Sequence, residues 1–286
     1  MRVAAVDLGT NTTRLLVADV DGSVEEVHRE SRITRLGEGV DARRRLLPLP
    51  IARVRNVLTD YRRTIESLEA ERTLAVATSA VRDAENGEAF LGEIEWSYGF
   101  ATQLASGDEE AELTRRGVDP PPGTLVLDIG GGSTELVLDD FHVSLPIGSV
   151  RFTERHGDDL RAIEEDVRRR LPDISPTRAV GVAGTVLQLA TLEMSERLTR
   201  ARAREQLERL AGMSVAERRV LPRMEPEHAP VIVAGAAILV AVLDAYHLDE
   251  LDVSVRDILD GIALAAAELP EPVEGDAPPG AYTCCC

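Results

Sequence analysis

Hydrophobic and polar positions along the chain follow two periods that alternate. In residues 51–68, apolar side chains recur every three or four positions, as on one face of an amphipathic helix. Short apolar runs at residues 3–6, 73–77, 100–104, 178–182 and 251–254 are typical of buried strands. Further helices are predicted over 87–98, 109–116, 159–170, 201–211, 215–221, 229–247 and 256–268, and a strand over 142–146. The alternation predicts an α/β fold.

An internal repeat organises this pattern. Residues 6–19 align without gaps on residues 127–140 at a constant offset (128 − 7 = 121). Each copy has an apolar run, a short Gly/Thr/Ser turn and a second apolar run, which is typical of a hairpin with a polar tip. The turns are Asp7–Thr13 and Asp128–Thr134. The repeat predicts two lobes of one fold.

Proline-rich residues 119–123 mark the boundary between the lobes, because consecutive prolines cannot continue a helix. We therefore expect an N-terminal lobe over residues 1–118 and a C-terminal lobe over 119–270. The three cysteines end the chain at 284–286 after a Pro-Pro-Gly segment, so residues 271–286 are predicted to be a disordered tail.

Charge narrows the function. The net charge is −18, and all 32 basic residues are arginines, which excludes a P-loop lysine or a Schiff base. Bulk acidity argues against a nucleic-acid partner. The apolar run 231–243 is shorter than the roughly 20 residues of a membrane span, and the N-terminus has no signal-peptide pattern. We expect a cytoplasmic protein without a membrane partner; the oligomeric state is open, a homodimer included.

The paired turns are candidate anion sites, because backbone N–H groups and hydroxyls converge there. Candidate phosphate ligands are Thr10, Asn11 and Thr12 in one turn and Gly130, Gly131, Gly132, Ser133 and Thr134 in the other. Asp7 and Asp128, at the strand ends, could hold Mg²⁺ against phosphate oxygens. Alternatively, each aspartate only hydrogen-bonds its own turn.

Two further sites carry charge that suits phosphate chemistry. Glu109 and Glu110 open a predicted helix; either could orient water as a general base, or both could be ordinary partners of the helix dipole. Adjacent helical positions diverge by about 100°, so only one can face a substrate. Arg82 follows a strand and could bind phosphate in a bidentate way, or form a surface salt bridge with Asp83 or Glu85.

Together these motifs resemble the Ppx/GppA family of exopolyphosphatases and guanosine pentaphosphate phosphohydrolases. The resemblance covers most of residues 1–268. It rests on AVDLGTN (5–11), RLGEGV (35–40), ATSAVRDAEN (77–86), SGDEEA (106–111), DIGGGSTELV (128–137), GSVRFTE (148–154) and DILDGI (257–262). It implies two similar actin-like (ribonuclease H-like) lobes, each with a mixed sheet, and a cleft between them.

The resemblance also implies an activity. Members are Mg²⁺-dependent (or Mn²⁺-dependent) hydrolases that release terminal phosphate from inorganic polyphosphate, or the 5′-terminal phosphate from guanosine pentaphosphate (pppGpp) in the stringent response. The family's catalytic glutamate precedes the alanine of SGDEEA, which is Glu110 here. Asp128 would hold the metal, with Asp7 as a second candidate ligand, and Arg82 would bind phosphate.

Two segments depart from the family pattern. Members often read Gly-Thr-x-Thr-Thr where this chain has residues 184–188, and Pro-Gly-Arg-x-Asp where it has 226–230. These departures motivate an alternative, a non-catalytic sensor that binds guanosine tetra- or pentaphosphate or polyphosphate. A second alternative is an ATP-dependent kinase or ATPase of the same fold, although the first lobe is too compact for the usual sugar-binding insertions.

Overall fold

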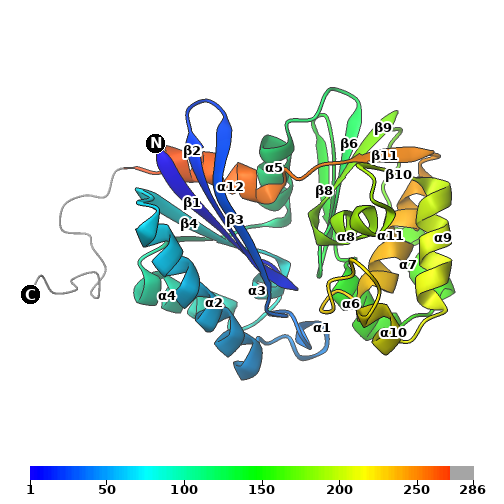
Figure 1. The fold of residues 1–286 in the computed structure, drawn as a ribbon, viewed down its shortest axis with the longest axis horizontal. Coiled ribbons are helices and arrows are strands. Elements are labelled where there is room, and N and C mark those ends of the chain that lie inside the picture. Colours follow the sequence, from blue (N-terminus) through cyan, green and yellow to red (C-terminus); the bar gives the residue numbers. More distant parts are fainter. Residues whose placement is uncertain (271–286) are drawn as a thin grey trace, which may run out of the picture. The chain divides into compact units, whose positions relative to one another are not determined.

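The computed structural model describes residues 1–270 (Figure 1). Tail residues 271–286, including the three cysteines, lie outside the described part of the chain. The described residues form twelve helices and eleven strands in two compact units, residues 1–109 with 258–270 and residues 110–257. Each unit contains one sheet.

The first unit is built on a five-stranded mixed sheet of order β3-β2-β1-β4-β5. The strands are β1 (Arg2–Leu8), β2 (Thr12–Val20), β3 (Val24–Ile33), β4 (Arg72–Ala77) and β5 (Ala101–Leu104). Strands β1, β2 and β3 pair in antiparallel fashion, whereas β4 runs parallel to β1 and β5 runs parallel to β4. Its helices are α1 (Val40–Arg43), α2 (Pro48–Ser67), α3 (Ser79–Arg82), α4 (Gly87–Tyr98) and α12 (Ile258–Glu268).

The second unit repeats this plan in a six-stranded sheet of order β10-β11-β9-β6-β7-β8. The strands are β6 (Thr124–Ile129), β7 (Thr134–Leu138), β8 (Phe141–Leu145), β9 (Arg178–Val182), β10 (Arg197–Thr199) and β11 (Glu250–Val253). Its helices are α6 (Ser149–His156), α7 (Leu160–Arg170), α8 (Ala183–Glu193), α9 (Arg200–Ala211), α10 (Val215–Arg219) and α11 (Ile232–Ala245), while α5 (Gly107–Val118) links the units. β8-β7-β6-β9 corresponds to β3-β2-β1-β4, which confirms two similar α/β lobes.

Packing explains the two most prominent apolar patterns. Helix α2 begins at Pro48, which suits a first helical position, and buries Val54, Leu58, Tyr61 and Ile65 on one face. In the second unit, Ile232–Leu243 of α11 are all buried in the core of that unit, so the apolar run is a core helix. Among residues 1–270, no helix has the length and hydropathy to cross a membrane.

The last helix belongs to the first unit. Helix α12 packs on β1, β2 and β4, and Figure 1 shows it in orange beside these strands. The Nη1 group of Arg72 donates to the carbonyl oxygens of Ala267, at 2.8 Å, and Leu269, and Arg29 forms an ion pair of 2.9 Å with buried Asp260. The compact units therefore differ from the predicted boundaries 1–118 and 119–270: the first transition lies at 109/110, and the chain returns to the first unit at residue 258.

Candidate active site

The two repeated turns have the same backbone geometry. In the first unit, the N–H of Gly9 donates to the carbonyl of Thr12 at 3.0 Å. In the second, the N–H of Gly130 donates to the carbonyl of Ser133, also at 3.0 Å. Donor and acceptor are each shifted by the offset of the sequence repeat. The repeat is therefore structural as well as sequential.

Each turn leaves backbone donors available. Within residues 1–270, the N–H groups of Thr10, Asn11, Gly131 and Gly132 donate to no other group of the chain. Thr10 and Gly131 occupy equivalent positions of the repeat, as do Asn11 and Gly132. Successive N–H groups in a tight turn form a nest for anionic oxygens. Each unit thus presents a candidate phosphate cradle.

A following segment supports each cradle from behind. The N–H of Gly37 donates to the carbonyl of Thr10 at 2.8 Å, and the N–H of Val150 donates to that of Gly131 at 2.8 Å. The contact in the second unit is close enough to require glycine: a Cβ on Gly148 would lie 2.5 Å from the carbonyl oxygen of Gly131. The supporting backbone thereby fixes the shape of the turn.

Several hydroxyl groups of the predicted phosphate ligands are already hydrogen-bonded within the chain. The hydroxyl of Thr134 is buried and donates to Ile147 at 2.7 Å, and the hydroxyl of Thr10 shares a hydrogen bond of 2.9 Å with Ser79. Buried Ser133 contributes a hydrogen bond to Glu135. Thr12 is half-buried at the turn, and Gly130 and Gly131 are partly exposed. The backbone is therefore better placed than the hydroxyls to receive phosphate.

Equivalent positions beside the two aspartates carry opposite charges. Across the β1–β2 ladder, Asp7 faces Arg14, and the Nη2 of Arg14 lies 2.8 Å from Oδ2 of Asp7. Across the β6–β7 ladder, Asp128 faces Glu135 at the same place in the repeat. The first aspartate is neutralised within its own hairpin, whereas the second has a carboxyl group beside it.

A buried carboxyl cluster forms around Asp128. Glu110, Asp128 and Glu135 are all buried, with exposed fractions of 7%, 6% and 2%. Burial raises the pKa of Glu135 well above its usual value, and the charges of Glu110 and Asp128 raise it further. Hydrogen bonds from Ser144, at 2.6 Å, and from Ser133 oppose this effect without cancelling it. Three carboxylates buried together are unfavourable unless a proton or a cation neutralises part of their charge.

The structure separates the two adjacent glutamates at the start of α5. Glu109 accepts the N–H of Ser106 at 2.8 Å, while its own N–H donates to the hydroxyl of Ser106 at 3.2 Å. This reciprocal pair is a capping box, and it lowers the pKa of Glu109. Glu110 instead turns into the second unit beside Glu135. One carboxylate is thus a helix cap, and the other is buried beside a second carboxyl group.

Arg82 ends the four-residue helix α3 and is half-buried. Its Nη1 donates to the carbonyl of Ala105 at 2.7 Å, so one arm of the guanidinium group is fixed by the backbone at the end of β5. Its place after β4, the strand parallel to β1, puts it at the same sheet end as the first turn. A role in binding phosphate stays a prediction.

The cluster suits a magnesium ion that is only partly held by protein. Among the described residues, no group of three or more acidic, histidine or cysteine side chains is arranged to hold a metal alone. Mg²⁺ commonly keeps several waters and uses one or two carboxylates plus substrate phosphates. Asp128 and Glu135 offer such a pair, whereas Asp7 is already paired with Arg14.

The two departing segments meet beside this site. The Nε2 of Gln188 donates to the carbonyl of Arg223 at 2.9 Å, and its Oε1 accepts the N–H of Glu225 at 3.0 Å. The ring of His228 lies over Gly184, at the start of α8, which follows the strand β9 paired with Asp128. Burial lowers the pKa of His228, against the raising effect of Glu225 and Glu227. The two segments that depart from the family pattern, residues 184–188 and 226–230, therefore contact each other.

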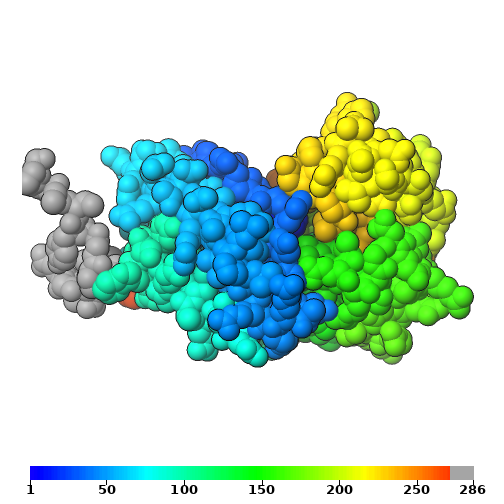
Figure 2. Space-filling model, turned by 90° about the horizontal axis from the view of Figure 1, so that it is seen from below, coloured from blue at the N-terminus to red at the C-terminus, as the bar shows by residue number. Residues whose placement is uncertain are grey.

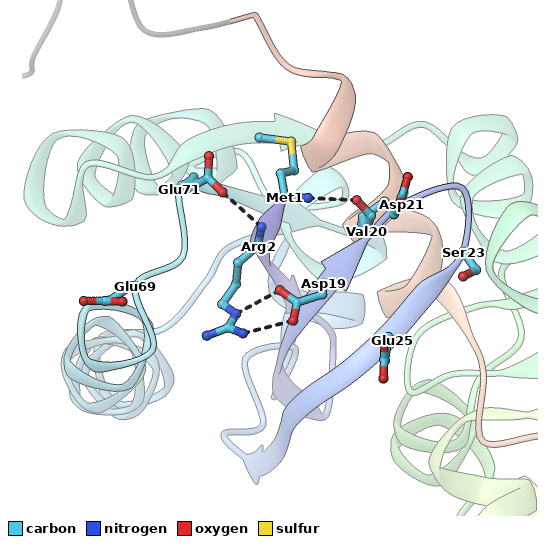
Figure 3. Close-up of a pocket in the computed structure, with 9 residues that line it drawn as sticks. All are labelled: Met1, Arg2, Asp19, Val20, Asp21, Ser23, Glu25, Glu69 and Glu71. Carbon is cyan, nitrogen blue, oxygen red and sulfur yellow. Dashed lines mark hydrogen bonds and ion pairs between the residues drawn. The ribbon is translucent and has the colours of Figure 1, made fainter.

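A surface pocket lies at the opposite end of β1 (Figure 3). Its volume is about 400 Å³, and its acidic lining residues are Asp19, Asp21, Glu25, Glu69 and Glu71. Arg2 within it is paired with Asp19, with both nitrogen–oxygen distances at 2.9 Å. So acidic a pocket does not suit a phosphate-bearing molecule.

Comparison with known proteins identifies the family of the chain. The model of the Ppx/GppA phosphatase family matches residues 15–268. The chain belongs to this family. Exopolyphosphatase 2 of Mycobacterium tuberculosis is 40% identical over an alignment covering 93% of this chain and 98% of the relative. A bifunctional 3-dehydroquinate synthase/phosphatase of Fusobacterium nucleatum is 30% identical, and the match covers 93% of this chain but 46% of that protein.

Solved structures of Ppx/GppA proteins share the fold. A crystal structure of an exopolyphosphatase-like protein superposes with a TM-score of 0.84 at 31% identity, covering 92% of this chain and 97% of that one. The Aquifex aeolicus member of the Ppx/GppA family gives a TM-score of 0.76 at 27% identity, covering 94% and 99%. The expected actin-like α/β fold is thereby confirmed.

Glu135 is a residue of the candidate site that the sequence analysis did not single out, although it lies within the motif at 128–137. It stands seven positions after Asp128, and antiparallel pairing across a short turn places the two residues opposite each other. The repeat contained a usable signal, because the position equivalent to Glu135 is Arg14 in the first copy. A reversal of charge at one position of a close repeat indicates different roles for the copies.

Proposed function

We propose that the chain hydrolyses the terminal phosphoanhydride bond of inorganic polyphosphate, with pppGpp as a second substrate of the same chemistry. The observation that carries the proposal is the pair of open backbone donors, the N–H groups of Gly131 and Gly132, in the same unit as the buried carboxyl cluster. The family match and the name of the 40% identical relative support it. Mg²⁺ or Mn²⁺ is the proposed cofactor.

In this proposal, Glu110 is the general base. Its carboxylate accepts a proton from water as the water oxygen bonds to phosphorus and the anhydride P–O bond breaks. Glu110 is buried, and the cap at Ser106 is formed by Glu109, so we assign the orientation of water to Glu110. The departing phosphate oxygen is stabilised by charge that is already in place.

Asp128 and Glu135 would hold the metal ion, which supplies positive charge to the phosphate oxygens. The pKa of Glu135 is raised by burial and then by repulsion from Glu110 and Asp128, and a bound cation would relieve this repulsion. The turn N–H groups would orient the phosphates. Arg82, fixed at Ala105, would add a permanent charge. In the first unit, the Asp7–Arg14 pair would hold the hairpin, so that its turn binds phosphate rather than metal.

The adjacent glutamates provide the test. Purified wild type, Glu110→Gln and the matched Glu109→Gln should be assayed for phosphate release from polyphosphate and from pppGpp, with Mg²⁺ and with chelator. Loss of a general base lowers turnover by about 10²–10⁴-fold, so Glu110→Gln should lose that much. Glu109→Gln should keep turnover within a few-fold, because glutamine at this position can still accept the N–H of Ser106.

Three other outcomes would refute the mechanism or favour an alternative function. Full activity in Glu110→Gln would refute the role of this residue. Tight binding of polyphosphate or pppGpp by wild type without turnover would favour a sensor. Phosphoryl transfer from ATP to a small acceptor would favour a kinase.

A further inference from the structure

Three consecutive arginines stand out in the first unit because they have no acidic partners. Arg43, Arg44 and Arg45 are exposed, and within residues 1–270 none of their side chains forms an ion pair or hydrogen bond. On the neighbouring helix α2, by contrast, exposed Arg55 and Arg63 and half-buried Arg62 are each paired with a carboxylate. In a chain of net charge −18, an uncompensated run of positive charge is a local reversal of field.

The backbone that carries these arginines is pinned. The carbonyl of Arg44 accepts the N–H of Glu85 at 2.8 Å. The side chain of Asn86 clamps Leu46, accepting its N–H at 2.8 Å and donating to its carbonyl at 3.1 Å. Leu46 itself is fully buried. The guanidinium groups are thus presented from a fixed loop, which reduces the entropy lost when they bind a ligand.

The same segment continues directly into the first phosphate cradle. The N–H of Arg35 donates to the carbonyl of Asn11 at 2.9 Å, and Gly37 rests against the side chain of Thr10. The side chain of Arg43 lies back over Gly39, with its Nε 3.9 Å from where a Cβ would stand. Gly39 is two positions after Gly37, a span of at most about 7 Å. Arg43 is therefore close to the cradle.

Arg35 adds a further positive charge to the same segment, next to the turn. Arg35 is half-buried beside the turn, and its side chain likewise forms no ion pair among the described residues. Its carbonyl accepts the side chain of Arg53, which is itself paired with Glu38 at 2.8 Å. Arg35 and Arg43–Arg45 thus belong to one segment that leads from the turn through α1 and lies in the blue part of the surface in Figure 2.

We propose that Arg35 and Arg43–Arg45 form a distal site for the inner phosphates of a polyphosphate chain that also contacts the cradle of the first unit. The inference rests on the proposed function and deepens it, because it selects long polyphosphate over short phosphate esters. Each additional phosphate group brings charge that these arginines neutralise. A nucleotide with a short phosphate tail extends past the cradle with fewer such groups and gains less.

The test compares three variants at several salt concentrations. The first is Arg43→Ala/Arg44→Ala/Arg45→Ala; the second is the charge-matched control Arg55→Ala/Arg62→Ala/Arg63→Ala. The third replaces the first three arginines with lysine. The readout is the ratio of kcat/KM for a long polyphosphate to kcat/KM for tripolyphosphate. Melting temperatures confirm that each variant is folded.

The ratio should fall at least about tenfold in the first variant, stay near the wild-type value in the control, and recover in the lysine variant. Each phosphate contact contributes about 0.7 to the slope of log affinity against log salt. For direct binding of long polyphosphate, the slope of log affinity against log salt should therefore be smaller in magnitude by about 2 in the alanine variant than in wild type.

Failures of the two proposals are distinguishable. Wild type that releases phosphate from no substrate refutes the proposed function itself. An active wild type whose long-to-short ratio is unchanged by the first variant, or falls equally in the control, overturns the distal site. If duplex DNA of equal total charge displaces polyphosphate from wild type and not from the first variant, the surface is a nucleic-acid site and the proposal is wrong.

Discussion

At the scale of single residues, one exchange of charge makes the two halves of the repeat unequal. Arg14 neutralises Asp7 within the first hairpin, whereas Glu135 adds a carboxyl group beside Asp128 in the second. In a buried ion pair the two charges already compensate each other, so the pair has little tendency to bind a further ion. A buried group of carboxylates has unfavourable negative charge, which a bound cation would neutralise. The same hairpin can therefore act as a clamp in one unit and as a metal site in the other.

The pKa of Glu135 predicts how stability changes with pH in chelator. Because this pKa is raised, the native state binds more protons than the unfolded state above the ordinary glutamate value of 4.5. Stability from this group is present below that value and is lost as pH rises through the raised pKa. Glu135→Gln removes the effect, so its melting temperature should exceed that of wild type increasingly from pH 4.5 to 8.

Thermal unfolding of the two proteins at pH 4.5, 6 and 8 gives the comparison. A difference that is constant over this range, or that shrinks towards pH 8, would contradict the buried-carboxyl account. Adding Mg²⁺ should narrow the difference at pH 8, because the cation replaces the proton in wild type.

The residue pattern indicated most of the candidate site residues but left Glu109 and Glu110 as alternatives, and only the family resemblance favoured Glu110. Glu109 and Glu110 are the same residue type in adjacent positions, and only the geometry of the helix start shows that Glu109 caps Ser106. The turns were recognisable from their Gly, Thr and Ser content. That the hydroxyl of Thr134 is used by Ile147, however, depends on a strand partner distant in sequence.

At the scale of elements, the turns depend on what packs behind them. Helix α6, after Gly148, places the N–H groups of Val150 and Arg151 on the carbonyl of Gly131, at 2.8 and 3.0 Å. Gly148 must approach the turn backbone closely for these bonds to form. The second cradle is thus shaped by the start of a helix as well as by the hairpin.

Gly148→Ala tests this support. Its Cβ would lie 2.5–2.6 Å from backbone atoms of Gly131 and Gly132, which cannot be accommodated without a shift. Overpacking of this kind destabilises by about 1–3 kcal/mol. A displaced cradle of roughly 1 Å should lower turnover by about 10²-fold. Chemical denaturation and phosphate release measure the two effects.

The matched control is Gly92→Ala in the exposed part of α4, where nothing lies within 4 Å of the new Cβ. It should gain roughly 0.5–1 kcal/mol of stability through helix propensity, with turnover retained. Equal behaviour of the two variants would show that the close approach at Gly148 has no special role.

Some elements escaped prediction for a physical reason. Strand β3 is mostly exposed or half-buried, and its sequence lacks the apolar alternation that marks a half-buried strand. It is held by pairing with β2 instead. Helix α3 has only four residues, too few for any period to show. The long buried helices and central strands were predictable because burial sets their pattern.

At the scale of the whole molecule, the chain leaves the first unit at Glu109 and returns to it at Ile258. The return is fixed by contacts between residues about 200 positions apart, such as Arg72 with Ala267. No local pattern encodes such a contact, so the sequence boundary was drawn at the prolines instead. The candidate base Glu110 stands at the first transition, directly after the cap that ends the contribution of the first unit.

The central claim is that the repeated aspartates have different roles, Asp128 in metal binding and Asp7 in holding its hairpin. The most direct measurement is a Mg²⁺ titration of polyphosphate turnover in Asp128→Asn and in Asp7→Asn, positions that the repeat makes equivalent. Asp128→Asn should raise the Mg²⁺ concentration for half-maximal turnover at least about tenfold, a loss of about 1.4 kcal/mol. Asp7→Asn should leave that concentration unchanged. Equal shifts in the two variants, or a shift in Asp7→Asn alone, would contradict the account.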